Sequence, residues 1–258
     1  MGKYSGYLIC SDFDGTFYTG KEIPKRNMDA IRRFKAGGGL FTLATGRTVD
    51  FIPPYFPDYD FDVPIINLNG AVLYDKENKK IIKEKHMRGT SREFCNMLLD
   101  TIPYVHMIGL FKDTHPIRIE ATERERLTDN ICESTYKIVL YVDARDSRER
   151  SDEAMAKATE LLGDRFSVVR SALTLLEILD PDLTKSVATH YLKKTVGAHT
   201  LICVGDFEND IDMVRDADIG YAVENAVPEL KAVADRITVS VENGAIAEII
   251  ADIDRKIG

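Results

Sequence analysis

The sequence lacks paired cysteines. Its four cysteines form no CxxC pair and have no metal-ligand spacing with histidine: Cys10, Cys95, Cys132 and Cys203. This pattern argues against a disulfide framework and against a structural zinc site. Two of them, Cys10 and Cys203, lie in short apolar runs, where a free cysteine packs as a small hydrophobic side chain. We therefore expect four reduced thiols, as in a cytoplasmic protein.

Signals for the membrane and for export are also absent. No apolar run approaches the length of about 20 residues that crosses a bilayer. The N-terminus has no basic stretch followed by an apolar one. We expect no signal peptide and no membrane partner.

An excess of positive charge is missing as well. The chain has 34 Lys and Arg against 42 Asp and Glu, which gives a formal net charge of −8. This balance argues against a nucleic-acid-binding surface, which needs basic side chains to meet the phosphates. A small phosphorylated ligand remains compatible with an acidic chain, provided that a metal ion or a few basic side chains supply local positive charge.

Apolar runs followed by helical patterns recur at both ends of the 258-residue chain. Continuous apolar strands that alternate with helices are typical of a parallel sheet covered on both faces. The patterns predict strands at 7–10, 40–44, 64–68, 200–204 and 219–223, and helices at 24–36, 184–195, 209–216, 228–234 and from about 243. We therefore predict an α/β fold with a Rossmann-like, doubly wound core.

The middle of the chain has a different pattern. A predicted hairpin with strands at 72–74 and 81–85 leads out of the core. Helices are then predicted at 91–100, 123–133 and 150–162, and strands at 105–111, 117–120, 137–142, 166–169 and 173–179. Such a stretch can form a small α+β domain inserted into the first one. We predict a core of residues 1–84 and 181–258 and an inserted domain of residues 85–180.

Two aspartates follow the first predicted strand. The segment Ser11-Asp12-Phe13-Asp14-Gly15-Thr16 begins where that strand ends, and open parallel sheets bind ligands beyond the carboxyl ends of their strands. Two carboxylates so close repel each other unless a cation or a proton intervenes. Taken alone, the segment is as compatible with an Asp-rich turn as with a site.

A second acidic loop, Gly205-Asp206-Phe207-Glu208-Asn209-Asp210, follows the strand predicted at 200–204. Two such loops would form an oxygen-rich pocket, which suits Mg²⁺. A calcium loop fails on spacing, because Phe17 and Ile211 stand where its glycine is required.

Groups that bind phosphate complete the pattern. Thr45-Gly46-Arg47 follows the strand at 40–44, and a hydroxyl with backbone amides at such a turn binds phosphate. Arg47 adds a charged donor or only covers the surface, and Lys185, in the first turn of a helix capped by Thr184, offers a positive charge. Together the segments predict a phosphoryl-transfer site, in which one aspartate attacks and another handles the leaving-group proton. The residues alone do not separate Asp12 from Asp14.

These segments resemble the four signatures of the haloacid dehalogenase superfamily of phosphatases. Asn69-Gly70-Ala71 and Asn225-Ala226-Val227-Pro228 resemble its Cof-type subgroup, which carries a large α/β cap of type IIB. The resemblance covers both ends of the chain. Residues 85–180 match the cap in position and length rather than in motifs.

The resemblance implies a role for each residue of the site. Asp12 would be the nucleophile and a Mg²⁺ ligand, and Asp14 the general acid and base, with its backbone carbonyl on the metal. Asp206 would be the remaining carboxylate ligand. The residues that bind the phosphoryl group would be Thr45, Gly46, Arg47, Lys185 and Asn209. Two residues, Asn209 and Asp210, would support the metal site.

By the same resemblance the protein would be a phosphoric monoester hydrolase. It would release phosphate from small phosphorylated metabolites, sugar phosphates above all, through a phospho-aspartyl intermediate. A phosphosugar mutase of the same superfamily stays open, as does a catalytically silent phosphate-binding protein. A P-loop-like nucleotide-binding switch is a further alternative, because Gly15 to Glu22 nearly spells that motif, although the final Ser or Thr is missing and the helix begins too late.

The substrate and the oligomeric state are not readable from the sequence. Five residues of the predicted cap are candidates for substrate contact: His86, His106, Met107, His115 and Arg118. Each is equally compatible with a place in the core or on the surface.

Overall fold

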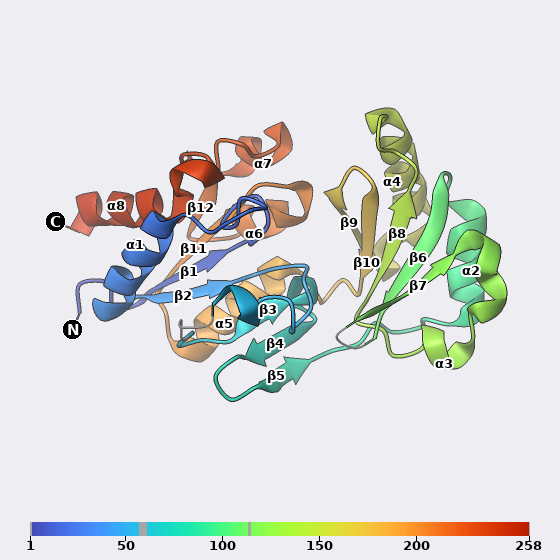
Figure 1. The fold of residues 1–258 in the computed structure, drawn as a ribbon, viewed down its shortest axis with the longest axis horizontal. Coiled ribbons are helices and arrows are strands. Elements are labelled where there is room, and N and C mark those ends of the chain that lie inside the picture. Colours follow the sequence, from blue (N-terminus) through green and yellow to red (C-terminus); the bar gives the residue numbers. More distant parts are fainter. Residues whose placement is uncertain (1, 57–60, 113–114, 258) are drawn as a thin grey trace.

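The computed structural model describes residues 2–56, 61–112 and 115–257. Two lobes lie side by side, and both ends of the chain lie in the same lobe (Figure 1). None of the helices in these residues combines the length and the apolar character needed to cross a bilayer.

A five-stranded sheet in the order β13-β12-β11-β1-β2 forms the centre of the first lobe, and every neighbouring pair is parallel. Its strands are β1 (Tyr7–Ser11), β2 (Leu40–Leu43), β11 (Thr200–Gly205), β12 (Ile219–Ala222) and β13 (Arg236–Ile237). The central strands β1 and β11 come from opposite ends of the chain. This sheet confirms the predicted Rossmann-like core.

Helices cover both faces of the sheet (Figure 1). On one face, Leu8 and Cys10 of β1 pack in a cluster with residues of α5 (Lys185–Val196) and α6 (Ile211–Arg215). Ile9 points to the other face, where the cluster includes residues of α1 (Lys25–Ala36), α7 (Pro228–Val233) and α8 (Ala245–Ile257). Because both faces are buried, the strands are apolar at successive positions.

A small antiparallel sheet leads from this core toward the second lobe. It contains β3 (Ile65–Asn67), β4 (Val72–Asp75) and β5 (Lys80–Glu84). The strand predicted at 64–68 exists, but it pairs with β4 and meets the large sheet through a single parallel bridge between Ala44 and Ile66. Figure 1 shows the hairpin of β4 and β5 below α5.

The second lobe is an antiparallel sheet in the order β7-β6-β8-β10-β9. Its strands are β6 (Val105–Phe111), β7 (Pro116–Glu120), β8 (Lys137–Val142), β9 (Ser167–Ala172) and β10 (Leu175–Leu179). The helices α2 (Arg92–Thr101), α3 (Asp129–Cys132) and α4 (Arg148–Leu162) pack on one face. The alternate residues of β8 line a cavity against the core, so the other face looks toward the first lobe. This lobe is the predicted α+β cap.

One helix of the cap departs from its prediction. Residues 121–126 form a 3₁₀ turn, and only Asp129–Cys132 are α-helical, instead of one helix at 123–133. Leu127 and Thr128 between them are extended. The Leu127 side chain is fully buried in the cap core, and Thr128 has the extended backbone of an N-cap, from which the short α3 begins.

Candidate active site

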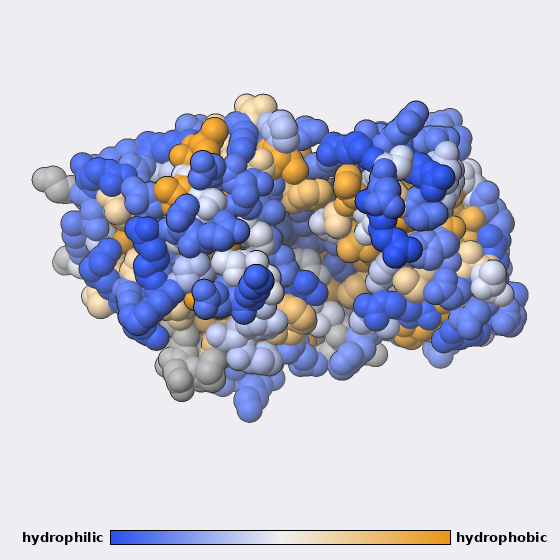
Figure 2. All heavy atoms as spheres, turned by 45° about the horizontal axis from the view of Figure 1, so that its top comes forward, coloured by the Kyte–Doolittle hydropathy of each residue, from blue (hydrophilic) through white to orange (hydrophobic). Residues whose placement is uncertain are grey.

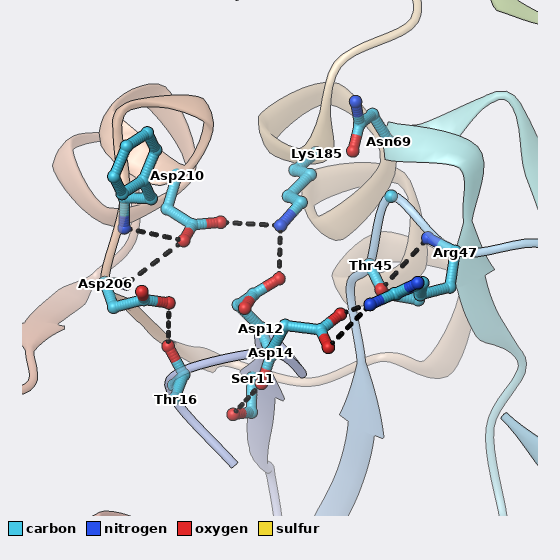
Figure 3. A network of polar contacts seen from close by, with 12 residues as sticks. Ser11, Asp12, Asp14, Thr16, Thr45, Arg47, Asn69, Lys185, Asp206 and Asp210 are labelled. Carbon is cyan, nitrogen blue, oxygen red and sulfur yellow. Dashed lines mark hydrogen bonds and ion pairs between the residues drawn. The ribbon is translucent and has the colours of Figure 1, made fainter. Parts of the chain in front are cut away.

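The predicted site residues meet beyond the carboxyl ends of β1, β2 and β11. Asp12 follows β1, Thr45 lies just beyond β2, and Asp206 follows β11 (Figure 3). The parallel register places these ends at one edge of the sheet. The structure therefore brings together segments that lie far apart in the sequence.

Lys185 joins two of the acidic segments. Its Nζ donates to Asp12 Oδ1 at 2.6 Å and to Asp210 Oδ1 at 2.7 Å, and its side chain is 1% exposed. The Thr184 side chain accepts from the Val187 amide, so it caps α5 as predicted and fixes the position of Lys185. Burial lowers the pKa of this ammonium, but the two carboxylates outweigh burial, so the net pKa lies above its ordinary value and the side chain stays charged.

Three carboxylates surround the same point. Asp12, Asp206 and Asp210 each offer one oxygen, and these atoms lie within 4.8 Å of one another. Burial raises the pKa of the Asp12 carboxyl well above its ordinary value, and repulsion from the other two carboxylates adds to this rise. Burial and repulsion from Asp210 raise the pKa of Asp206 to about 7. One buried ammonium does not balance three carboxylates.

This donor set fits a hard divalent cation. Asp210 uses its second oxygen, Oδ2, to accept from the amides of Asp206 and Phe207. The Oδ2 atoms of Asp12 and Asp206 accept no hydrogen bond from the residues that the structure describes. Two carboxylate oxygens thus remain for a metal, as Mg²⁺ prefers. Asp210 instead supports the loop and Lys185.

Other contacts hold the two acidic loops against each other. Thr16 Oγ1 donates to Asp206 Oδ1 at 2.7 Å, and Asn225 Nδ2 donates to the Gly15 carbonyl at 2.8 Å. Gly15 has φ +81°, and a Cβ there would lie 2.5 Å from Asp206 Oδ2, so only glycine fits. The Asn225 segment, which carried part of the family resemblance, therefore supports the first aspartate loop.

Asp14 lies beside Arg47 rather than among the other carboxylates. Arg47 forms a bidentate ion pair with it, and its guanidinium stacks 4.1 Å from the Phe51 ring centroid. The Arg47 backbone amide donates to Thr45 Oγ1 at 3.1 Å. Figure 3 shows the Arg47 guanidinium pointing to Asp14 and the Arg47 backbone amide pointing to the Thr45 hydroxyl.

A cavity of about 740 Å³ lies between the site and the cap. The surface is hollowed between the two lobes (Figure 2). Core residues that line it include Asp12, Asp14, Thr45, Gly46, Arg47, Asp206 and Asn209, and cap residues include His115, Arg118, Lys137, Tyr141 and Glu177. Of the five cap candidates named from the sequence, His115 and Arg118 line this cavity. The other three candidates do not line it: His86, His106 and Met107. The His86 ring instead stacks on Tyr136.

Sequence reasoning missed Lys137 and Glu177 near the Thr45–Arg47 turn, and it gave no role to Asn69, which it cited only for the family resemblance. A signal for Lys137 existed in the alternation along β8. Lys137, Val139 and Tyr141 line the cavity, whereas the residues between them pack under the cap helices. A lysine on an otherwise apolar strand face could therefore have been predicted to line a cavity.

The P-loop alternative finds no geometric support. Helix α1 begins only at Lys25, and Lys21 is exposed. The segment after Gly15 instead forms a turn, in which Thr19 Oγ1 accepts from the Glu22 amide. No helix N-terminus is thus available to cradle a nucleotide phosphate at this turn.

Comparison with known proteins adds independent findings. Residues 9–250 match the family of haloacid dehalogenase-like hydrolases. The chain is 22% identical to 5-amino-6-(5-phospho-D-ribitylamino)uracil phosphatase YitU of Bacillus subtilis, over 95% of this chain and 97% of that protein. It is 26% identical to the chloroplastic endoribonuclease YBEY of Arabidopsis thaliana, over 96% of this chain but only 46% of that protein. The chain thus spans less than half of the plant protein.

The fold has close counterparts among solved structures. A sugar phosphatase of haloacid dehalogenase subclass IIB has a TM-score of 0.77 and 17% sequence identity. The match covers 96% of this chain and 99% of that one. At this identity the likeness concerns the fold, which includes both the core and the cap.

Proposed function

Because the chain belongs to the haloacid dehalogenase-like hydrolases, with the Cof-type fold, we propose that it is a Mg²⁺-dependent phosphatase whose Asp12 carries the phosphoryl group. The observation that supports this most directly is the position of Lys185. Its buried ammonium lies between Asp12 and Asp210, next to a third carboxylate. A phosphate monoester needs positive charge of this kind beside a carboxylate nucleophile.

The proposed reaction has two steps. Asp12 attacks phosphorus, the bond to the ester oxygen breaks, and Asp14 gives its proton to the departing oxygen. Water then attacks phosphorus of the phosphorylated Asp12 and passes a proton to Asp14, which releases phosphate and restores both side chains. Lys185 and the Thr45–Arg47 turn hold the phosphoryl oxygens.

For this role Asp14 must turn toward the leaving group. In the structure its carboxylate contacts Arg47 at the rim of the cavity. We infer that a bound phosphoryl group competes for the Arg47 guanidinium and so releases Asp14.

The Asp12 and Asp206 carboxylates would hold Mg²⁺, together with the backbone carbonyl of Asp14. Asn209 and Asp210 would support them. When bound, the ion supplies the positive charge that cancels the repulsion between the ester dianion and Asp12. The oxygen-only donor set favours Mg²⁺ over softer metals.

The substrate is proposed to be a small phosphorylated polyhydroxy compound, with sugar phosphates first. Two relatives act on such compounds by their names, a phosphoribitylamino-uracil phosphatase and a sugar phosphatase. The cavity of about 740 Å³ and its polar cap residues suit a ligand of this size. We propose that residues 85–180 form the domain that selects it. Four free, buried cysteines agree with a reducing compartment such as the cytoplasm.

The test is phosphate release from a panel of phosphorylated metabolites, with Mg²⁺ and with EDTA. We expect release by the wild type with Mg²⁺ and none by Asp12→Asn. Asp212→Asn is the matched control, because Asp212 lies on α6 and pairs with the exposed Arg215. Activity that survives Asp12→Asn would contradict the proposed nucleophile. Activity only with a bisphosphorylated activator would support the phosphosugar mutase instead.

A further inference from the structure

Lys137 and Glu177 form a buried ion pair on the face of the cap sheet that looks toward the core. Lys137 Nζ lies 2.5 Å from Glu177 Oε2, and the two side chains are only 2% and 6% exposed. They stand on the adjacent strands β8 and β10 and line the catalytic cavity. No sequence motif contains them.

This pair contacts the phosphate-binding turn of the other lobe. Lys137 Nζ donates to the Gly46 carbonyl at 2.9 Å. Asn69 Nδ2, from the core, donates to Glu177 Oε2 at 2.6 Å. The fit is close, because a Cβ on Gly46 would lie 3.0 Å from Asn69 Oδ1 and 3.4 Å from Lys137 Nζ. Cap and core thus meet at Gly46.

One peptide group connects this contact to the Thr45 hydroxyl. The Gly46 carbonyl accepts from Lys137, and the N–H of the same peptide unit, on Arg47, donates to Thr45 Oγ1 at 3.1 Å. Because a peptide unit is planar, holding its oxygen fixes the direction of its N–H. Thr45 Oγ1 then accepts a hydrogen bond from this N–H. The hydroxyl hydrogen of Thr45 is thus available to donate to a phosphoryl oxygen.

The turn is held from the other side by the core. The Asn69 amide donates to the Thr45 carbonyl at 3.0 Å, and the Thr45 amide donates to the Ile66 carbonyl at 2.8 Å. These two contacts fix the backbone at Thr45, but neither of them holds the Gly46–Arg47 peptide unit. Among the described residues, Lys137 is the side chain that donates to its oxygen.

Stability alone gives little reason for such a pair. Burying two charges costs free energy that their attraction often only offsets, and apolar replacements are often neutral or stabilising. A buried pair that reaches across two lobes to a catalytic turn has a second use, which is to make the geometry of that turn depend on the cap.

We propose that Lys137, oriented by Glu177, is a positioning residue that sets the Thr45 hydroxyl for phosphoryl binding only when the cap is docked on the core. This inference rests on the proposed phosphatase function. It deepens that function, because it makes the cap part of the phosphoryl site rather than only a selector of the leaving group.

The first test is a double-mutant cycle between Lys137→Met and Thr45→Val, read as kcat/KM and as inhibition by inorganic phosphate. We expect Lys137→Met alone to lower kcat/KM by about ten- to a hundredfold and to weaken phosphate inhibition, as a misplaced group does. In the Thr45→Val background it should have little further effect. Equal losses in both backgrounds would overturn the proposal.

Arg148→Met is the matched control. Arg148, on α4 of the cap, pairs with Glu208 and Glu229 of the core, so this variant also removes a cationic contact between the lobes. Its effect should be small and should multiply with that of Thr45→Val. A cycle identical to that of Lys137→Met would mean that any loosening of the cap suffices, which would overturn a specific role for Lys137.

The second test does not depend on turnover. Hydrogen exchange of the Arg47 amide, which Thr45 Oγ1 protects, should be about tenfold faster in Lys137→Met than in the wild type and unchanged in Arg148→Met. Unchanged exchange in Lys137→Met would overturn the proposal. Since Lys137→Met leaves Glu177 unpaired, the Lys137→Met/Glu177→Met variant keeps the test interpretable if the single variant folds poorly. Failure of the wild type to hydrolyse any ester would count against the phosphatase, while the exchange result would still decide this contact.

Discussion

Arg47 donates two hydrogen bonds to Asp14, from Nε to Oδ2 at 2.8 Å and from Nη2 to Oδ1 at 3.0 Å. Both groups are partly exposed at the rim of the cavity. The backbone amide of Arg47 donates to the Thr45 hydroxyl, so both side chains extend from the same turn (Figure 3). A phosphoryl group bound at Thr45 would therefore meet Arg47 and draw it away from Asp14.

Arg47→Met should raise KM and weaken inhibition by inorganic phosphate, each by about tenfold, because the variant lacks the charged donor that we propose for the phosphoryl group. Arg47→Lys is the control that keeps the charge but loses the two-pronged geometry, so it should recover only part of the affinity. Steady-state kinetics with phosphate as a product inhibitor measures both constants. An unchanged phosphate inhibition constant in Arg47→Met would show that Arg47 only holds Asp14.

Mg²⁺ should stabilise the folded protein. In the proposed site it would bind the ionised carboxylates of the folded protein, so the melting temperature should rise as Mg²⁺ is added. Asp206→Asn should remove most of this rise, and Asp212→Asn should retain it, because Asp212 lies outside the carboxylate cluster. Thermal unfolding with EDTA and with increasing Mg²⁺ tests this. A rise of equal size in Asp206→Asn would place the bound metal elsewhere.

The metal-free protein should lose stability as the pH rises. The pKa of Asp206 is raised from its ordinary 3.8 to about 7 in the folded protein, mainly by burial. The unfolded chain therefore releases this proton near pH 4, while the folded protein keeps it until about pH 7. Stability from this group is present below pH 4 and is lost as the pH rises to about 7.

Urea unfolding in EDTA at pH 5 and pH 8 measures this loss. Asp206→Asn should be less sensitive to pH than the wild type and more stable at pH 8, because the amide cannot ionise. Asp212→Asn should follow the wild type. Equal pH dependence in the wild type and Asp206→Asn would show that ionisation of Asp206 does not cause the loss.

Arg118 should influence the choice of substrate. Its Nε donates to the Tyr141 hydroxyl at 2.9 Å, both residues line the cavity from the cap, and no described carboxylate pairs with its guanidinium. Arg118→Leu should change the relative kcat/KM values across the substrate panel by about tenfold or more. Inhibition by inorganic phosphate should stay the same, since phosphate has no leaving group to contact the cap. A uniform loss for all substrates would indicate a role in folding or cap docking instead.

Local patterns predicted the core well and also the positions of the candidate site residues beyond its strands. The apolar runs of β1 and β11 predicted two strands. The Thr184 cap predicted the start of a helix and the position of Lys185 in its first turn. Each of these features depends on a few neighbouring residues. The strand ends then placed the acidic loops at one edge of the sheet. Long-range packing decided the rest. The extended backbone at Leu127 and Thr128, for example, interrupts a helix that local periodicity favoured.

Contacts between the lobes could not be predicted from the sequence. Lys137 and Glu177 lie 40 positions apart, on two strands whose pairing and register only the fold defines. Arg47 was recognised as a candidate phosphate ligand, but its pairing with Asp14 depends on the relative place of two loops. Residue types and spacing therefore predicted a chemistry, and the tertiary structure was needed to show which groups touch.

The order of the strands also has a consequence for how the protein forms during synthesis. β1 pairs with β11, which the ribosome makes only after the whole cap. The five cap strands, by contrast, all lie between Val105 and Leu179. We expect the cap to fold first on the emerging chain. During that time the apolar side chains of β1 and β2 are not yet buried by the rest of the core. The apolar side chains of β1 and β2 thus stay without the helices α5 to α8 that cover them until those helices are made.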